Sequence, residues 1–171
     1  KIDPDGTYLE LIFSLIASAK QRIYIETPYF IPEPGILLAL KTAVMSGVDV
    51  RIVIPSNPDH MLVYYASISF IQELLQMGVR VYGYRRGFLH AKVVIVDDMA
   101  CSGSANMDIR SFSGQFEINA VFMDKKVVDR LVRDFYADLR DSKELLWPEF
   151  QRRPKVQKAK EAFGRLLSPL F

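Results

Sequence analysis

The sequence predicts an α/β protein with a mixed, largely parallel sheet that is flanked by helices. In the first half, apolar strand-like runs alternate with helical stretches, an order that requires crossover connections between parallel strands. In the second half, strand-like runs follow one another more closely, which indicates antiparallel hairpins. A chain of 171 residues is long enough for one domain with a hydrophobic core.

The elements of the first half are delimited by periodicity and by proline and glycine. Residues 8–19 carry apolar side chains at helical spacing, and residues 22–26 alternate like a strand. Pro34 near the start and Gly47 just past the end delimit a helix at 34–45. The remaining elements of this half are a strand at 48–54, a helix that begins at its expected N-cap Asp59 and runs to about 77, and a strand at 79–84.

The second half contains shorter strands and a polar tail. The predicted elements are a strand at 90–96, a tight turn at Asp97-Asp98, a strand at about 100–103, a strand at 116–123 and an amphipathic helix at 125–140. We divide the chain into a domain at 1–150 and a basic amphipathic tail at 151–171.

The bulk composition is that of an ordinary globular protein, with 50% hydrophobic and 25% charged residues. The net charge of +2 is weaker than that of a dedicated nucleic-acid binder, so no nucleic-acid partner is expected. Cys101 is the single cysteine, which excludes an intrachain disulfide. His60 and His90 are the only histidines and show no metal-ligand spacing, so we expect no metal and no cofactor.

No signal peptide and no apolar run of membrane-spanning length is found in the sequence. The chain opens at Lys1 within a polar phrase, without an initiator methionine. We therefore interpret it as a piece of a longer protein.

The chemistry concentrates at His90 and Lys92, which share one face of the predicted strand. A histidine serves as nucleophile or proton donor near neutral pH, and a lysine neutralises phosphate charge. Ser104 and Asn106 follow as small hydrogen-bond donors, and Glu117 is placed to orient an imidazole. A lone histidine at a strand start is more often structural, so the combination, rather than any one residue, indicates a phosphodiester site.

His90-x-Lys92, Asp97 and Gly103-Ser104-x-Asn106 together resemble the signature of the phospholipase D superfamily. The match is closer still to the C-terminal half of bacterial cardiolipin synthases. Supporting phrases lie at 24–32, 87–92, 105–112 and 116–120, and the ending 166–171 is also similar. The chain has five residues between Asp97 and Gly103, where the family usually has six.

The resemblance implies transfer of a phosphatidyl group between two phosphatidylglycerol molecules, giving cardiolipin and glycerol through a phosphohistidine without a metal. It assigns catalytic roles to His90, Lys92 and Asp97, and it makes Ser104, Asn106 and Glu117 phosphate-binding or supporting residues. If the strand is regular, however, Asp97 points away from His90, which favours a supporting role at the turn.

The resemblance also implies partners, because such synthases build one site from two motifs and this chain carries the second. The other motif comes from an N-terminal half or from a second copy of this chain. The expected location is the bacterial cell membrane, with the catalytic domain on the cytoplasmic side.

Four further residues are candidates for lining the substrate path. Tyr29 and Phe30 follow a strand end, where open α/β sheets place ligands, although a packed aromatic pair is an equal alternative. Arg85 and Arg86 flank the turn before the motif, where solvated turn charges are the alternative to contact with lipid phosphate.

The tail carries an apolar stripe with basic residues around it. The stripe consists of Val156, Ala159, Phe163, Leu166 and Leu170. This pattern is typical of a helix that lies on an anionic membrane surface, and equally of one that packs on a missing half.

Two other functions remain open from the sequence. One is a single-motif phosphodiesterase or nuclease that completes its site as a homodimer. The other is a half-domain that binds lipid or a partner without turnover.

Overall fold

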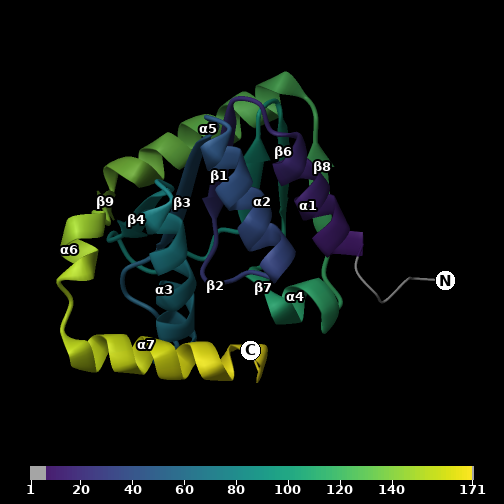
Figure 1. Ribbon diagram of the computed structural model, residues 1–171. Helices are drawn as coiled ribbons and strands as arrows, with labels where there is room; N and C mark the ends of the chain where they lie inside the picture. The colour runs from purple at the N-terminus through teal and green to yellow at the C-terminus, as the bar shows by residue number, and fades with distance from the viewer. Residues whose placement is uncertain (1–6, 171) are drawn as a thin grey trace.

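The computed structural model describes residues 7–170 and shows a mixed sheet between two layers of helices (Figure 1). The seven strands of the sheet run in the order β8-β6-β5-β1-β3-β4-β9. They are β1 (Arg22–Glu26), β3 (Asp49–Pro55), β4 (Arg80–Tyr84), β5 (Val93–Val96), β6 (Met99–Gly103), β8 (Asn119–Phe122) and β9 (Ser142–Glu144). Two short strands, β2 (Phe30–Ile31) and β7 (Met107–Asp108), pair separately and in parallel.

The helices divide between the two faces of the sheet. One face packs against α1 (Thr7–Ser18), α2 (Pro34–Met45) and α3 (Met61–Gln76), and the other against α5 (Lys125–Arg140). The shorter elements are α4 (Ile109–Ser113), α6 (Trp147–Gln151), α7 (Lys155–Leu167) and the 3₁₀ turn η1 (Ser168–Leu170).

The alternation of β1 explains how two cores form on one sheet. Ile23 and Ile25 point into the core under α1, α2 and α3, whereas Tyr24 between them packs with Phe135 of α5. Successive side chains of a strand face opposite sides, so a central strand must be apolar at every position.

The predicted α/β fold with a mixed sheet and flanking helices is confirmed, with more antiparallel pairing than expected. Within the seven-stranded sheet, β1–β3 and β3–β4 pair in parallel, while the other four described pairs are antiparallel. One of the unexpected antiparallel pairs involves β9, which pairs with β4 at the edge of the sheet. This strand has three polar residues, a pattern that does not predict a strand from sequence.

Element boundaries agree closely where the periodicity was long, as in the helices at 34–45 and 125–140. Three boundaries were wrong. The predicted strands at 90–96 and 116–123 begin only at Val93 and Asn119. The helix expected to be capped by Asp59 begins at Met61, because the Asp59 carboxylate instead accepts a hydrogen bond of 2.6 Å from the Tyr29 hydroxyl.

No helix among residues 7–170 combines the length and the apolar character that a bilayer crossing requires.

Candidate functional site

The site begins in the extended segment that leads from the turn at Gly87 into β5. Gly87 has a φ of +118°, a left-handed conformation that favours glycine. His90 lies exposed in this segment, and its ring stacks on Phe88 with a centroid distance of 5.6 Å. The Lys92 ammonium donates to the His90 carbonyl at 3.2 Å, so the two residues of the predicted pair are neighbours.

Lys92 is the half-buried cation of the site. Burial lowers its pKa, while the negative charges of Glu117, Asp108 and Asp59 act in the opposite direction. The effect of burial on the pKa outweighs the effect of these carboxylates, so the nearby negative charges do not fully compensate the Lys92 ammonium. An added anion such as a phosphodiester therefore stabilises it.

The loop after β6 is held beside this segment by the β5–β6 hairpin. Val93 pairs with Ser102, and the Gly103 N–H donates to the Lys92 carbonyl at 3.4 Å. A Cβ on Gly103 would overlap the Ile118 carbonyl, so this close approach requires glycine. A two-residue turn at 97–98 accommodates the short spacing between Asp97 and Gly103.

Glu117 organises the hydroxyl groups of the loop. Its two carboxylate oxygens accept hydrogen bonds from the Ser104 hydroxyl and, at 3.0 Å, from the Ser111 hydroxyl. The Ser111 hydroxyl also accepts the Asn106 backbone N–H at 3.0 Å. Glu117 therefore positions Ser104 directly and Asn106 through Ser111, while its role toward an imidazole stays a prediction.

Asn106 faces a polar cavity of about 260 Å³. Its side-chain oxygen is buried and has no hydrogen-bond partner within the described residues. The cavity is lined by Tyr29, His60, Val63, Asn106, Asp108, Arg110 and Gln115. A buried acceptor without a partner is costly and is a frequent sign of a place where a ligand or water binds.

Thr27 joins this loop to the end of β1, a role that the sequence analysis missed. Its hydroxyl accepts the Met107 N–H at 3.2 Å and donates to the Tyr29 carbonyl at 2.8 Å. Ser111 was missed as well. Thr27 lies in the phrase at 24–32 and Ser111 in the phrase at 105–112, both of which support the family resemblance. Their place in these phrases is the sequence signal that could have identified them.

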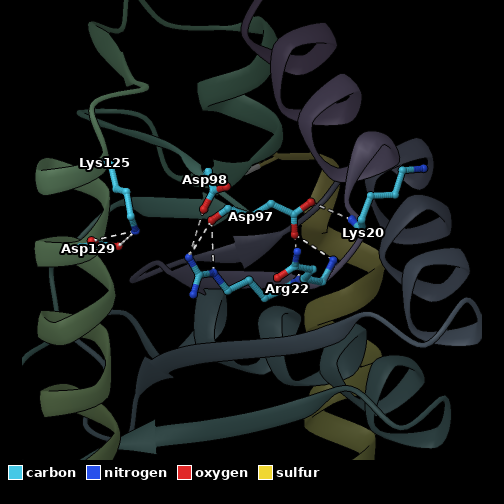
Figure 2. Close-up of polar contacts among 7 residues, drawn as sticks. Lys20, Arg22, Asp97, Asp98, Lys125 and Asp129 are labelled. Carbon is cyan, nitrogen blue, oxygen red and sulfur yellow. Dashed lines mark hydrogen bonds and ion pairs between the residues drawn. The ribbon is translucent and has the colours of Figure 1, made fainter.

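Asp97 lies at the far end of β5 from His90, in the turn to β6 (Figure 2). Its carboxylate accepts the backbone N–H groups of Lys20, Gln21 and Arg22 at 2.7–2.9 Å. Burial alone would raise its pKa, but these three hydrogen bonds and the charge of Arg22 lower it. The position is that of a structural support.

The four candidate lining residues separate in the structure. Tyr29 lines the polar cavity. Phe30 does not: it is fully buried in the core, and its N–H donates to the Ser67 hydroxyl, so the prediction that it lines the substrate path is wrong. Arg85 and Arg86 are exposed at the turn, where Arg86 forms an ion pair of 3.3 Å with Asp141.

No cluster of three or more histidine, cysteine or acidic side chains suited to a metal occurs in the described part of the chain, residues 7–170.

Residues 12–139 match a family profile described as "Cardiolipin synthase, PLD-like domain". The chain belongs to this family. Over 166 residues it is 50% identical to cardiolipin synthase 2 of Bacillus cereus, covering 96% of this chain and 32% of that protein. It is 46% identical to the major cardiolipin synthase ClsA of Bacillus subtilis, covering 98% and 36%. The chain thus spans about a third of the length of these curated relatives.

Solved structures of the phospholipase D-like fold agree with the family assignment. The phospholipase D family member Nuc from Salmonella typhimurium superposes with a TM-score of 0.71 and 25% identity, covering 84% of this chain and 94% of that one. The phosphatidylserine synthase of Haemophilus influenzae superposes with a TM-score of 0.73, covering 95% and 44%, and at 19% identity it supports the fold alone.

Proposed function

We propose that the chain supplies one half of a phosphatidyl-transfer site, the half with the second of two His-x-Lys motifs. The observation that carries the proposal is that the β5–β6 hairpin holds the loop of Ser104 and Asn106 beside the segment of His90 and Lys92. His90 is exposed, Lys92 is half-buried, and Glu117 holds the loop in place. This set offers a proton carrier, a cation and hydrogen-bond donors to a phosphodiester.

The proposed reaction proceeds through two displacements at phosphorus. A histidine of the other motif attacks phosphatidylglycerol, and the bond from phosphorus to the glycerol headgroup oxygen breaks as a phosphohistidine forms. His90 donates the proton that the leaving glycerol takes up. It then accepts a proton from the headgroup hydroxyl of a second phosphatidylglycerol. The oxygen of that hydroxyl attacks phosphorus, the phosphorus–nitrogen bond breaks, and cardiolipin and the free histidine of the other motif are released.

The remaining residues act on the charge of the phosphoryl group. Lys92 and the amide of Asn106 bind the non-bridging oxygens, and Ser104 and Glu117 hold the loop in register. Asp97 supports the strand rather than the reacting atoms, and the scheme uses no metal or cofactor.

The proposal is tested with His90→Ala in the intact enzyme that contains this chain. Transfer is measured as cardiolipin formed and glycerol released from phosphatidylglycerol vesicles. We expect loss of transfer, with an unchanged circular dichroism spectrum and midpoint of unfolding. Normal turnover by the folded variant contradicts the proposal. Tyr84→Phe, at the end of β4 and outside the loop, serves as the control.

The proposed place of action is the bacterial cell membrane, because both substrates are phospholipids. We place the domain on the cytoplasmic side, where its free cysteine Cys101 stays reduced. The other motif comes from further sequence of a longer protein or from a second copy of this chain.

A second candidate is a single-motif phosphodiesterase that is active as a homodimer. It is favoured by one observation: the chain covers 94% of the Salmonella Nuc chain, a relative of similar size. In this case size-exclusion chromatography gives a dimer that hydrolyses a soluble phosphodiester. A folded monomer that binds lipid without any turnover supports a non-catalytic half-domain.

A further inference from the structure

Helix α7 is oriented opposite to the usual amphipathic pattern, with its polar side packed inward. Glu161 is only 3% exposed and forms an ion pair of 2.5 Å with Arg153. Arg165 reaches Glu73 of α3 at 2.6 Å and lies over the Phe70 ring. The sequence leaves the orientation of the tail open, and these contacts decide it.

A glycine sets how closely α7 approaches α3. A Cβ on Gly164 would lie 2.7 Å from the backbone nitrogen of Ala66, closer than real Cβ atoms come. The polar side of α7 is therefore held by backbone contact as well as by ion pairs. The opposite side of α7 faces away from the rest of the protein.

The outward side of α7 carries the apolar stripe that the sequence analysis identified. Val156 is 68% exposed, Phe163 is 56% and Leu166 is 74%. Val156 and Phe163 border a groove of about 450 Å³ between α7 and α3, lined by Leu62, Tyr65, Val156, Ala159, Lys160 and Phe163. Several large apolar side chains at one surface mark a binding face rather than scattered exposure.

Within residues 152–167 the exposed charges are all of one sign. The exposed basic residues of the segment are Arg152, Lys155, Lys158 and Lys160. The one acidic residue of α7 is Glu161, which is buried and paired with Arg153. An outward surface of apolar and cationic side chains is complementary to an anionic lipid interface, where lysines meet headgroups and apolar groups meet acyl chains.

The face lies next to the candidate site. His60 and Val63, at the start of α3, line the polar cavity with Asn106, whereas Leu62 and Tyr65 in the same part of α3 line the apolar groove. Figure 1 shows α7 lying across the end of α3, at the edge of the molecule where β2, β7 and α4 also lie.

We propose that the outward face of α7, with the start of α3, docks on an anionic phospholipid bilayer and holds the polar cavity at the level of the headgroups. Docking itself is independent of catalysis, while its use in presenting a phosphodiester to His90 rests on the proposed function. The proposed occupant of the face is the bilayer, and a protein partner on this face is a distinct outcome of the test.

Vesicle binding tests the docking face. Sedimentation compares vesicles of phosphatidylserine mixed with phosphatidylcholine and vesicles of phosphatidylcholine alone, so that phosphatidylglycerol is absent. For Phe163→Ser with Leu166→Ser we expect binding to the anionic vesicles to fall by about tenfold or more, since two apolar side chains no longer leave water. Leu38→Ser with Met45→Ser removes two equally exposed side chains from α2 and is the matched control. Equal binding by the two double variants overturns the proposal.

A fluorescent probe distinguishes a bilayer from a protein partner. Because Cys101 is buried, an environment-sensitive dye attaches selectively at Leu166→Cys, with Met45→Cys as the control. The expected result is a blue shift at Leu166→Cys only when anionic vesicles are added. If the dye at Leu166→Cys is already blue-shifted relative to the dye at Met45→Cys before vesicles are added, protein covers the face, and the proposal is contradicted.

The catalytic proposal and the docking proposal fail separately. His90→Ala is expected to bind vesicles like the unaltered protein, because the imidazole is not part of the face. Binding without transfer in any condition contradicts the proposed function alone, and transfer in detergent without vesicle binding contradicts the docking alone.

Discussion

Asp97 and Arg22 are joined by hydrogen bonds in which the backbone of each residue pairs with the side chain of the other. The Arg22 N–H donates to the Asp97 carboxylate at 2.9 Å, and the Arg22 guanidinium donates to the Asp97 carbonyl at 2.9–3.1 Å. The contact joins the β5–β6 turn to the start of β1 (Figure 2). Strands β1 and β5 pair antiparallel at the centre of the sheet. A motif residue that the resemblance made catalytic thus anchors the strand that leads back to His90.

The first prediction follows from this anchor. Asp97→Asn removes the charge that three backbone N–H groups bind, while asparagine tolerates the φ of +50° at this position. We expect a loss of about 1–3 kcal/mol in the free energy of unfolding, measured by urea denaturation at pH 7.

The pH dependence of the same variant gives a second readout. The pKa of Asp97 is below its ordinary value of 3.8 in the folded state, so its contribution is present above pH 3.8 and is lost as pH falls through the folded pKa. The stability difference between Asp97→Asn and the unaltered protein should therefore vanish in acid. A strictly catalytic Asp97 predicts no difference at any pH.

The second prediction concerns Asn106, whose amide NH2 is the proposed donor to the phosphoryl oxygens, while its buried amide oxygen has no partner in the described chain. Asn106→Ala is expected to lower kcat for phosphatidyl transfer by about 10²–10³, as for loss of a donor to the developing charge. Its stability should stay equal or rise, because an unsatisfied buried acceptor is removed. Gln115→Ala, in the same cavity but exposed, is the control, and a parallel fall in stability and kcat contradicts a phosphate-binding role.

The third prediction tests the approach of α7 to α3. Gly164→Ala improves helix propensity by about 1 kcal/mol, yet its Cβ meets the backbone at Ala66. We expect the steric conflict to dominate, with a net destabilisation of about 1–3 kcal/mol in thermal or urea unfolding. Ala162→Gly on the exposed side of the helix measures the propensity effect alone. A stabilised Gly164→Ala means that α7 does not lie on α3 as described.

The fourth prediction concerns Glu26, buried in β1. Burial, followed by the charge and hydrogen bond of Asp138, raises its pKa to about 8. Stability should therefore fall as pH rises from the ordinary value of 4.5 through about 8, because the unfolded state ionises first. The fall is limited to about 1.4 kcal/mol per pH unit for one group.

Glu26→Gln should abolish that pH dependence, because a neutral amide replaces the carboxyl and still donates to Asp138. The measurement is the free energy of unfolding between pH 5 and pH 9. Glu10→Gln, an exposed carboxyl on α1, is the control and should leave the profile unchanged. Identical profiles for Glu26→Gln and the unaltered protein contradict a protonated Glu26.

Local pattern determined which elements form, and it predicted which residues carry the chemistry. Ile23, Tyr24 and Ile25 alternate as a central strand must, and the helices with long periodicity were placed at their observed bounds. His90, Lys92 and Asn106 were identified from residue type and order, because a motif of a known family is a property of the sequence itself.

Only the tertiary structure decided which neighbour each polar or apolar face meets. It buried Phe30 in the core, directed Glu117 to Ser104 and Ser111, and added β9 at the edge of the sheet. It also turned the polar side of α7 inward, because α3 offers Glu73 as a counter-charge and a backbone surface that fits Gly164. Periodicity fixes which side chains share a face, but the partner of that face is set by packing between segments far apart in the chain.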